Sequence, residues 1–330
     1  MGWLTSFLYS QFFVTLPLPT HDFTDQTIIV TGSNTGLGLE AARHLSRLNT
    51  SLLILAVRNQ AKGKAAKQSI LASTGRPESS IEVWDLDMQS YESIKEFCTR
   101  VNTLHRLDAV LANAGIVTNH FNLVGGYESI ITTNIIGTFL LAFGLLPKLK
   151  QSAEEYKMQP RLSIVASDLH FIAKFAEGQE EDIFAALNNE KSELGLERYA
   201  ASKLIQVYGV RELAHLLTRE ADSVSPTVIV NCMTPGYCQS DFHREDVGFE
   251  WLKRWILSTI FARTTEVGSR ALVASIAAGE ESHGSYMADC VVAEPGPLVR
   301  GSEGMKLQKK VWDQLLRQLE TIQPGITSSV

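Results

Sequence analysis

The stretch TIIVTGSNTGLG, residues 27–38, decides the fold, because an apolar run passes directly into a glycine cluster. A continuous β-branched run is typical of a strand that is covered on both faces of a parallel sheet. The glycines follow in the spacing G-x-x-x-G-x-G, and a helical pattern begins among them. Glycines there let backbone N–H groups approach a pyrophosphate at the helix N-terminus. The stretch predicts a phosphate-binding turn, as against a glycine-rich turn without a ligand, formed by Gly32, Ser33, Asn34, Thr35, Gly36, Leu37 and Gly38.

The same rhythm of short apolar runs and longer helical segments continues along the chain. Helical segments such as 39–48 and 90–104 separate most of the runs. This alternation predicts an α/β fold with a Rossmann-type, doubly wound parallel sheet in a single domain. We expect strands at 27–31, 52–57, 81–85, 108–112, 162–166 and 227–231, with a short last strand at 285–287.

Composition limits the class of protein. The chain has 330 residues, of which 45% are hydrophobic and 20% charged, so no large block of it reads as disordered. A net charge of −6 argues against nucleic acid as the main partner. The four cysteines are scattered without a C-x-x-C pair, which favours a reducing, cytoplasmic location and gives no metal site.

Three segments depart from the α/β rhythm. Residues 1–25 form an apolar N-terminal extension to the domain at 26–330, and residues 1–18 carry no charged side chain. Leu4, Phe7, Leu8 and Phe12 recur there at helical spacing, which predicts one apolar helix face. The helix either packs on the body or near the substrate mouth, or it lies on a membrane surface. Residues 174–198 read as an acidic surface insertion, and the aromatic-rich residues 237–266 as a helical substrate lid.

The end of the second predicted strand indicates which nicotinamide cofactor binds. An NAD site has an acidic residue about 20 residues past the glycines, for the ribose 2′-hydroxyl. Arg58 stands there instead, and no acidic residue occurs between Glu40 and Glu78. A guanidinium suits a 2′-phosphate, so NADP(H) is favoured, unless Arg58 is an ordinary solvated side chain. Asp87, after the third strand, is placed to contact the adenine end or to cap a helix.

Tyr199 and Lys203 lie four residues apart, on one face of a predicted helix. A tyrosine has a pKa near 10, and we expect the ammonium and a positive nicotinamide to lower it. Tyr199 then becomes a proton donor to a carbonyl or an acceptor from an alcohol. The pattern also matches Tyr91 and Lys95, but Tyr91 follows the third strand, so we interpret it as a surface helix residue.

Three further residues are candidates for the same site. Ser167 ends the fifth strand, where its hydroxyl holds the substrate oxygen or makes a turn. Asn134 begins an apolar helix and either relays protons through water or caps that helix. His170 has no acidic partner along the chain, so we expect a structural or substrate-wall role.

Taken together, these residues resemble the short-chain dehydrogenase/reductase family over nearly all of residues 26–290. The resemblance implies a catalytic tetrad of Asn134, Ser167, Tyr199 and Lys203, with the last two also binding the cofactor. Arg58 within VRN is similar to the retinol-dehydrogenase branch, and the whole chain is similar to reductases of fungal natural-product pathways. Further cofactor-binding residues implied by the family pattern are Asn113, Ala114, Gly115, Pro235, Gly236 and Ser240.

Two departures from the family pattern stand out: the gap from Ser167 to Tyr199 is long, and Ala166 replaces a frequent serine. The prediction is an NADP(H)-dependent oxidoreductase acting on a small apolar carbonyl or alcohol. The alternatives are an NADP(H)-binding sensor or scaffold without turnover, and an isomerase or dehydratase on the same fold. Apolar helix faces at 135–149 and 200–217 suggest a homodimer, and a monomer is equally compatible.

Overall fold

The structure is a computed structural model that describes residues 2–190, 194–220, 225–239 and 261–329. Its centre is an eight-stranded sheet in the order β3-β2-β1-β4-β7-β8-β9-β10, parallel except for the β9–β10 pair. This confirms the doubly wound α/β fold, and the antiparallel β10 is an addition that we did not predict. The strands are β1 Thr27–Thr31, β2 Leu52–Val57, β3 Ile81–Asp85, β4 Ala109–Ala112, β7 Arg161–Val165, β8 Ile229–Met233, β9 Tyr286–Ala288 and β10 Val291–Ala293.

Burial explains how the apolar runs became strands. Every residue of β1 is buried, as a central parallel strand requires, whereas β3 at the sheet edge has two exposed residues. The strand predicted at 227–231 is displaced by two residues: β8 begins at Ile229 and ends at Met233. The Ile229 N–H donates to Pro160 O at 2.9 Å, and pairing with β7 then runs to Met233.

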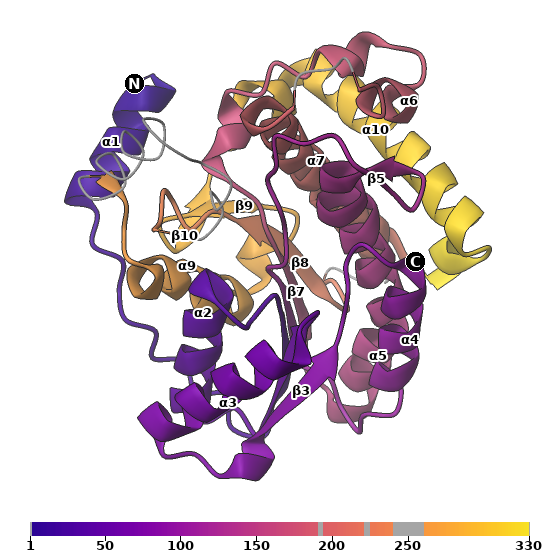
Figure 1. The fold of residues 1–330 in the computed structure, drawn as a ribbon. Helices are drawn as coiled ribbons and strands as arrows, with labels where there is room; N and C mark the ends of the chain where they lie inside the picture. The colour runs from indigo at the N-terminus through magenta and orange to yellow at the C-terminus, as the bar shows by residue number, and fades with distance from the viewer. Residues whose placement is uncertain (1, 191–193, 221–224, 240–260, 330) are drawn as a thin grey trace.

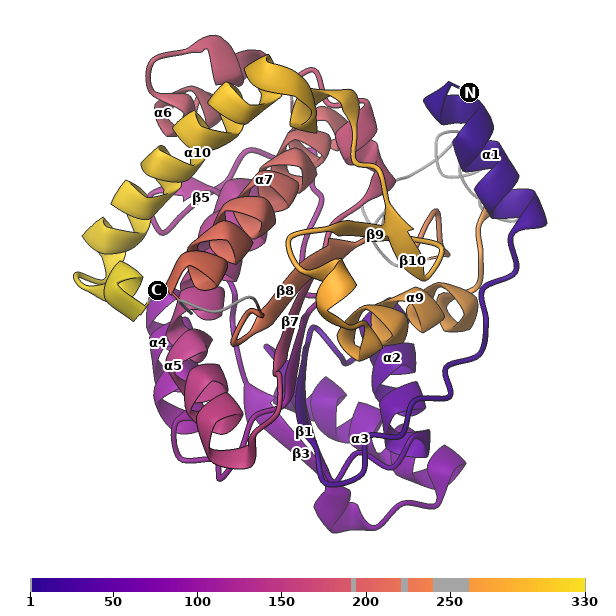
Figure 2. The ribbon, with the colours of Figure 1, turned by 180° about the vertical axis from the view of Figure 1, so that it is seen from behind.

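Helices cover both faces of the sheet (Figures 1 and 2). One apolar core joins α2, α3 and α9 to the sheet, and a second joins α4, α5, α7 and α10 to it. The covering helices are α2 Gly36–Arg47, α3 Gln60–Thr74, α9 Thr265–Ala277, α4 Tyr91–Val101, α5 Thr138–Tyr156, α7 Leu196–Glu220 and α10 Gly301–Ile322. Smaller elements are the hairpin of β5 Leu123–Val124 and β6 Tyr127–Glu128, and single turns at Glu78–Ser80, Glu280–Ser282, Pro297–Val299 and Ile326–Ser329.

The C-terminal helix α10 lies over α5 and α7. Trp312 is fully buried and stacks on Phe143 at a ring-centroid distance of 5.9 Å. Gln308 of α10 donates to Glu212 of α7 at 2.7 Å. The last helix thus covers apolar surface of α7 and contacts α5 through Trp312, and the homodimer stays a prediction. The apolar segment Ile131–Tyr156 is long enough to span a membrane, but 89% of its most apolar window is buried inside the fold, as in a core helix.

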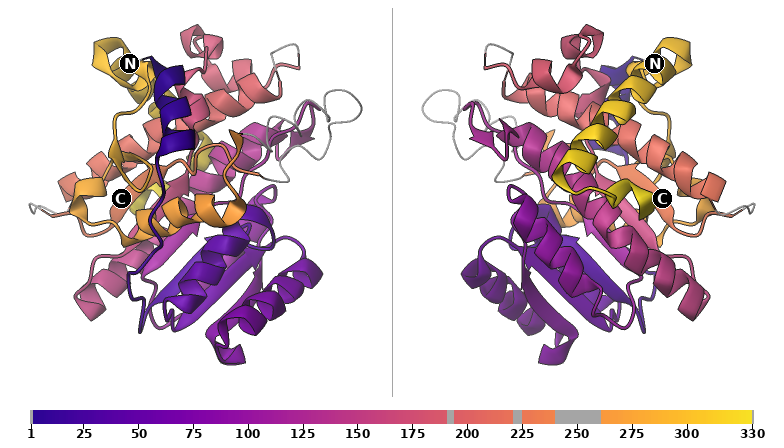
Figure 3. Two further views of the ribbon diagram at one scale, coloured as in Figure 1. Left: turned by 90° about the vertical axis from the view of Figure 1, so that its left-hand side faces the viewer. Right: turned by 90° about the vertical axis from the view of Figure 1, so that its right-hand side faces the viewer.

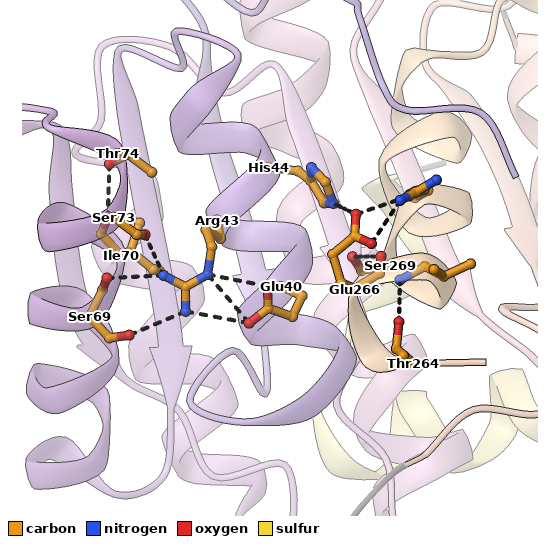
Figure 4. A network of polar contacts seen from close by, with 12 residues as sticks. Glu40, Arg43, His44, Ser69, Ile70, Ser73, Thr74, Thr264, Glu266 and Ser269 are labelled. Atoms are coloured by element: carbon orange, nitrogen blue, oxygen red, sulfur yellow. Dashed lines mark hydrogen bonds and ion pairs between the residues drawn. The ribbon is translucent and has the colours of Figure 1, made fainter. Parts of the chain in front are cut away.

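Polar contacts fix α2, the helix that begins at the glycine loop, between its two neighbours (Figure 4). Arg43 donates to Ser69 O of α3 at 2.9 Å and pairs with Glu40. On the other side, His44 Nε2 lies 3.0 Å from Glu266 of α9, which also binds Arg270. The C-terminal half of α2 is thereby held between α3 and α9.

The acidic insertion is packed, which corrects the prediction of a surface excursion. It contains a 3₁₀ turn, Ala176–Gln179, and the short helix α6, Ile183–Leu187. Ile183, Phe184 and Leu187 are fully buried, so the apolar minority of this acidic segment belongs to the core. Gln314 of α10 accepts from Ile183 N at 2.9 Å and donates to Glu181 O at 2.8 Å.

The N-terminal extension forms helix α1, Trp3–Phe13, which packs on the body beside β9, β10 and α9 (Figures 1 and 3). The predicted apolar face packs on the body only in part, because Phe7 and Leu8 are half-buried whereas Leu4 and Phe12 are 58% and 49% exposed. Polar contacts also hold the helix. Gln11 donates to Tyr237 O at 3.0 Å and to Phe261 O at 2.8 Å.

Candidate active site

The glycine loop has the shape that a dinucleotide phosphate needs. A Cβ on Gly38 would lie 2.5 Å from Asn113 Nδ2 and 2.6 Å from Gly32 O, so the close approach of α2 requires glycine. Gly36 has a φ of +59°, and a Cβ there would meet nothing within 4 Å. The space beside the α2 N-terminus is thus open to a ligand, and its first turn carries no acidic side chain.

Asn113 and Ala114, directly after β4, hold the glycine loop in place through hydrogen bonds. Asn113 Nδ2 donates to Thr31 O at 2.9 Å and to Gly32 O at 3.3 Å. Ala114 N donates to Thr31 Oγ1 at 2.9 Å. The Ser33 hydroxyl turns inward to Val30 O at 2.9 Å, so its side chain shapes the loop and only its backbone is left to face a phosphate.

Arg58 and Asp87 follow the neighbouring strands β2 and β3. Arg58 is exposed directly beyond β2, and Gly32 N donates to Ala56 O near that strand end at 2.9 Å. The guanidinium thus lies at the same sheet edge as the glycine loop. Asp87 accepts from Gln89 N at 3.0 Å, so its carboxylate stabilises the turn before α4.

Asn134 lies inside a π-helical turn, Ile131–Gly137, that leads into α5. It is fully buried and is not a helix cap, which excludes that alternative. Its Oδ1 accepts from Ile116 N at 2.9 Å, and its Nδ2 donates to Ile116 O at 3.0 Å and to Ser202 Oγ at 3.1 Å. These contacts connect the loop after β4 to helix α7. A widened turn of this kind is often found at functional sites.

Lys203 reaches from α7 to the end of β7. Its Nζ donates to Val165 O at 2.7 Å and to Gln206 Oε1 at 2.9 Å. Gln206 Nε2 in turn donates to Asn134 O at 2.6 Å, so Gln206 joins two of the predicted tetrad residues. Burial lowers the pKa of Lys203 to about 7, because the charged ammonium loses water. Sequence reasoning missed Gln206, although it lies one helical turn past Lys203.

Tyr199 lies beside Ser167 and Lys203. Its phenol is hydrogen-bonded to the Ser167 side chain, and its ring centroid is 5.3 Å from Lys203 Nζ. Burial raises the pKa of Tyr199 well above its ordinary value, and the bond to Ser167 offsets this only in part. In the chain by itself burial therefore outweighs the bond to Ser167, and the lowering expected with a positive nicotinamide stays a prediction.

Ser167 meets Tyr199 despite the long segment between them. It stands directly before the 3₁₀ helix Asp168–Phe171, and its Oγ accepts from Leu169 N at 3.2 Å. The Ser167 hydroxyl thus caps this turn and also contacts Tyr199. His170 is fully buried, with Nδ1 2.7 Å from Ser167 O and Nε2 accepting from Gly296 N at 2.8 Å. Its role is structural, because it holds the turn that presents Ser167.

Pro235 and Gly236 follow β8 and connect to the base of the same turn. Thr234 Oγ1 accepts from Gly236 N at 3.2 Å and from Asp168 N at 3.2 Å. The ends of the predicted lid pair with each other, since Gln239 N donates to Arg263 O at 2.9 Å. Ser240 and lid residues 241–260 lie outside the described residues.

Tyr91, the other tyrosine with a matching lysine, lies away from these groups. It begins α4 and is half-buried against Gly125, so the prediction of a surface residue is wrong. Burial raises its pKa to about 12. None of the contacts described for Tyr91 joins it to Ser167, Asn134 or Lys203.

Comparison with known proteins agrees with this geometry. Residues 26–155 match the family model of the short chain dehydrogenases. Short-chain dehydrogenase anuD of Penicillium roqueforti is 46% identical over 97% of this chain and 84% of that protein. Short chain dehydrogenase/reductase dmxR8 of Cryptosporiopsis sp. is 43% identical over 98% of this chain and 99% of that protein.

Solved structures share the fold at low identity. A short chain dehydrogenase from Shigella flexneri complexed with NADP is 20% identical, with a TM-score of 0.58 over 82% of this chain and 99% of that chain. The RhlG/NADP complex of Pseudomonas aeruginosa is 18% identical, with a TM-score of 0.61 over 81% of this chain and 95% of that chain. The retinol-dehydrogenase branch stays a prediction. With relatives of this identity along almost its whole length, the chain belongs to the short-chain dehydrogenase/reductase family.

Proposed function

We propose that this chain is an NADP(H)-dependent oxidoreductase that converts a carbonyl group of a small apolar molecule to an alcohol. The observation that carries the proposal is the hydrogen bond between Tyr199 and Ser167. The Lys203 amine lies beside this pair and is joined to Asn134 by hydrogen bonds through Gln206. A hydroxyl pair beside a buried amine is suited to hold a carbonyl oxygen and give it a proton.

The cofactor's place is inferred from the fit of the residues present. The open side of Gly36 and the α2 N-terminus suit the pyrophosphate, and Arg58 suits a 2′-phosphate. We assign the carboxamide end to the backbone at Gly236. Bound NADPH supplies the hydride for the carbonyl carbon.

The chain's own groups handle the oxygen and its proton. Ser167 Oγ and the Tyr199 hydroxyl hold the substrate oxygen, and Tyr199 donates its proton as the alcohol forms. Burial keeps the phenol protonated at neutral pH, which is the form that reduction needs. Lys203, with a pKa of about 7, is able to gain or lose a proton at Nζ near neutrality. We propose reduction as the physiological direction because NADPH pools usually favour it.

The test is stoichiometry. Purified protein is mixed with NADPH or NADH and a panel of apolar ketones and aldehydes, and absorbance at 340 nm is followed while alcohol is measured by mass spectrometry. The proposal expects one alcohol per NADPH oxidised and a preference for NADPH. Product without NADPH loss would favour an isomerase or dehydratase, and tight NADPH binding without product on any panel member would favour a sensor or scaffold.

Two further parts of the proposal concern the cellular location and the metabolic pathway of the reaction. We place the reaction in the cytoplasm, supported by the four cysteines, which are all free thiols. We also place it in natural-product biosynthesis, an expectation that rests on the likeness to fungal relatives. Localisation of a fluorescent fusion and metabolite profiling of a deletion strain test these two points separately.

A further inference from the structure

Two side chains that are remote in the sequence pack against the turn at Pro235 and Gly236. A Cβ on Gly236 would lie 2.5 Å from Gln11 Oε1 and 2.9 Å from Arg263 Nη1. Arg263 Nη1 also donates to Pro235 O at 3.5 Å. Gly236 has a φ of +75°, which glycine adopts without strain. The turn that we assign to the carboxamide end of the cofactor therefore has Gln11 and Arg263 close against its backbone.

Through its Nη2 atom, Arg263 joins this turn to two other parts of the chain. The nitrogen donates to Ser10 O of α1 at 2.7 Å and to Ser10 Oγ at 3.1 Å. It also pairs at 2.9 Å with Asp289, in the turn between β9 and β10, whose carboxylate accepts from Ser10 Oγ at 2.7 Å. The Arg263 side chain is 6% exposed, so water competes little for these bonds. One guanidinium thus connects the Pro235 turn, α1 and the β9–β10 turn.

The residue after the turn is fixed by the same two partners. Tyr237 N donates to Gln11 Oε1 at 3.1 Å, and Gln11 Nε2 donates to Tyr237 O at 3.0 Å. Tyr237 O also accepts from Arg263 N at 2.9 Å. Before the turn, Thr234 Oγ1 accepts from Gly236 N at 3.2 Å. The backbone on both sides of Gly236 is thus fixed by hydrogen bonds.

We infer that Arg263 is a positioning residue of the cofactor site: it holds the Pro235–Gly236 turn against α1 and so fixes the backbone that receives the nicotinamide carboxamide. The inference rests on the cofactor site of the proposed function, which places the carboxamide at that turn. Arg263 touches neither the cofactor nor the substrate in this role. Ser10 and Gln11 support the turn in the same way, so the N-terminal extension contributes to cofactor binding. A turn held in its bound form binds more tightly, because less freedom is lost on binding.

Two ligands that share only the adenine end of the cofactor test this inference. NADPH carries the nicotinamide, whereas adenosine 2′,5′-bisphosphate carries the adenine, the ribose and the 2′-phosphate without it. Titration calorimetry measures the affinity of the wild type and of Arg263→Gln for both ligands. We expect Arg263→Gln to weaken NADPH binding about tenfold, on the scale of one charge-assisted hydrogen bond, and to leave binding of the bisphosphate unchanged. A general loss of fold would weaken both ligands alike.

Arg270→Gln is the matched control. Arg270 of α9 also donates to the N-terminal segment, at Leu16 O and 2.8 Å, and it pairs with Glu266 at 2.8 Å. None of the contacts described for Arg270 reaches the turn at Gly236. We therefore expect the ratio of the two affinities to keep its wild-type value, even where this variant is less stable. A ratio that falls as far in Arg270→Gln as in Arg263→Gln contradicts the role of Arg263.

Gln11→Ala is a second test variant, because it leaves no buried charge without a partner. We expect it to weaken the binding of NADPH and not that of the bisphosphate, as Arg263→Gln does. Equal loss of both ligands in the two variants, or loss of neither, overturns the inference, while NADPH-dependent turnover by the wild type upholds the proposed function. Selective loss of NADPH binding in both variants, with no alcohol formed by the wild type from any panel member, supports the inference and counts against the proposed function.

Discussion

Gln206 bridges Lys203 and Asn134, accepting from the lysine Nζ at 2.9 Å and donating to the asparagine carbonyl at 2.6 Å. All three side chains are buried, so each hydrogen bond is made without competition from water. The amide thus holds the Lys203 amine in place, and it is a positioning residue of the proposed site.

Changes at Gln206 are expected to move the pH profile of turnover in opposite directions. Gln206→Leu removes an acceptor that favours the charged amine, so the pKa of Lys203 falls below about 7. Gln206→Glu adds a negative charge and raises that pKa. The measurement is kcat against pH from 5 to 9 with saturating NADPH. A profile that stays in place in both variants contradicts this role, whereas a merely structural role would lower kcat equally at every pH.

Arg58→Ala is expected to weaken NADPH binding roughly tenfold or more and to leave NADH binding nearly unchanged. Charge-assisted hydrogen bonds to a phosphate are worth about 1.5–3 kcal/mol, and NADH lacks the phosphate. Titration calorimetry with both cofactors measures the effect. Arg317→Ala, an exposed arginine on α10, is the control. Equal loss for the two cofactors would assign Arg58 to another role.

Stability is expected to fall with acid below pH 6.5 because of His170. Its folded pKa is lowered to about 4 by burial, from an ordinary 6.5. Between these values the unfolded chain binds the proton and the folded chain does not, so the free energy of unfolding drops by about 1.4 kcal/mol per pH unit. The stabilisation is complete above pH 6.5 and is lost as pH approaches 4.

Chemical denaturation at several pH values, with His170→Asn, measures this slope. The variant is less stable at pH 7, because buried partners lose a hydrogen bond, but its stability falls less steeply toward pH 4. His215→Asn, at an exposed position of α7, serves for comparison and keeps the wild-type slope. Identical slopes in His170→Asn and the wild type would rule out the assignment.

Gln11→Ala is expected to loosen α1 from the body. The variant loses two hydrogen bonds donated by Gln11 and one that it accepts from Tyr237 N at 3.1 Å. Limited proteolysis should cut the N-terminus several-fold faster, and KM should rise while kcat changes little. Tyr9→Ala, on the exposed outer face of the same helix, is the matched control. Equal cleavage rates for the two variants would show that Gln11 does not anchor the helix.

Much of the fold follows from burial patterns that are local in sequence. The runs at 27–31 and 52–57 coincide with β1 and β2, because central parallel strands are buried on both faces and so are largely apolar. The run at 81–85 coincides with β3, although this edge strand has two exposed residues. β10 has no such pattern, since Val291 and Val292 are exposed and pair only with β9. The polar contacts of α1 were not predictable, because the partners of Ser10 and Gln11 lie far along the chain.

The candidate site likewise contains residues that sequence spacing predicts and residues that it does not. Tyr199 and Lys203 were predictable from helical spacing, and the glycine loop from its place between strand and helix. Gln206 and Arg263 were not, since their roles come from contacts between separate elements. The sign of the Tyr199 pKa shift likewise depends on burial, which no spacing along the chain reveals.

The most direct test of the central claim is NADPH oxidation at 340 nm by the wild type and by Tyr199→Phe, with NADPH affinity measured in parallel. Loss of a general acid costs about 10²–10⁴ in rate, so the account predicts at least a hundredfold lower kcat in the variant, with the NADPH dissociation constant within about twofold. Turnover by Tyr199→Phe at the wild-type rate would contradict it.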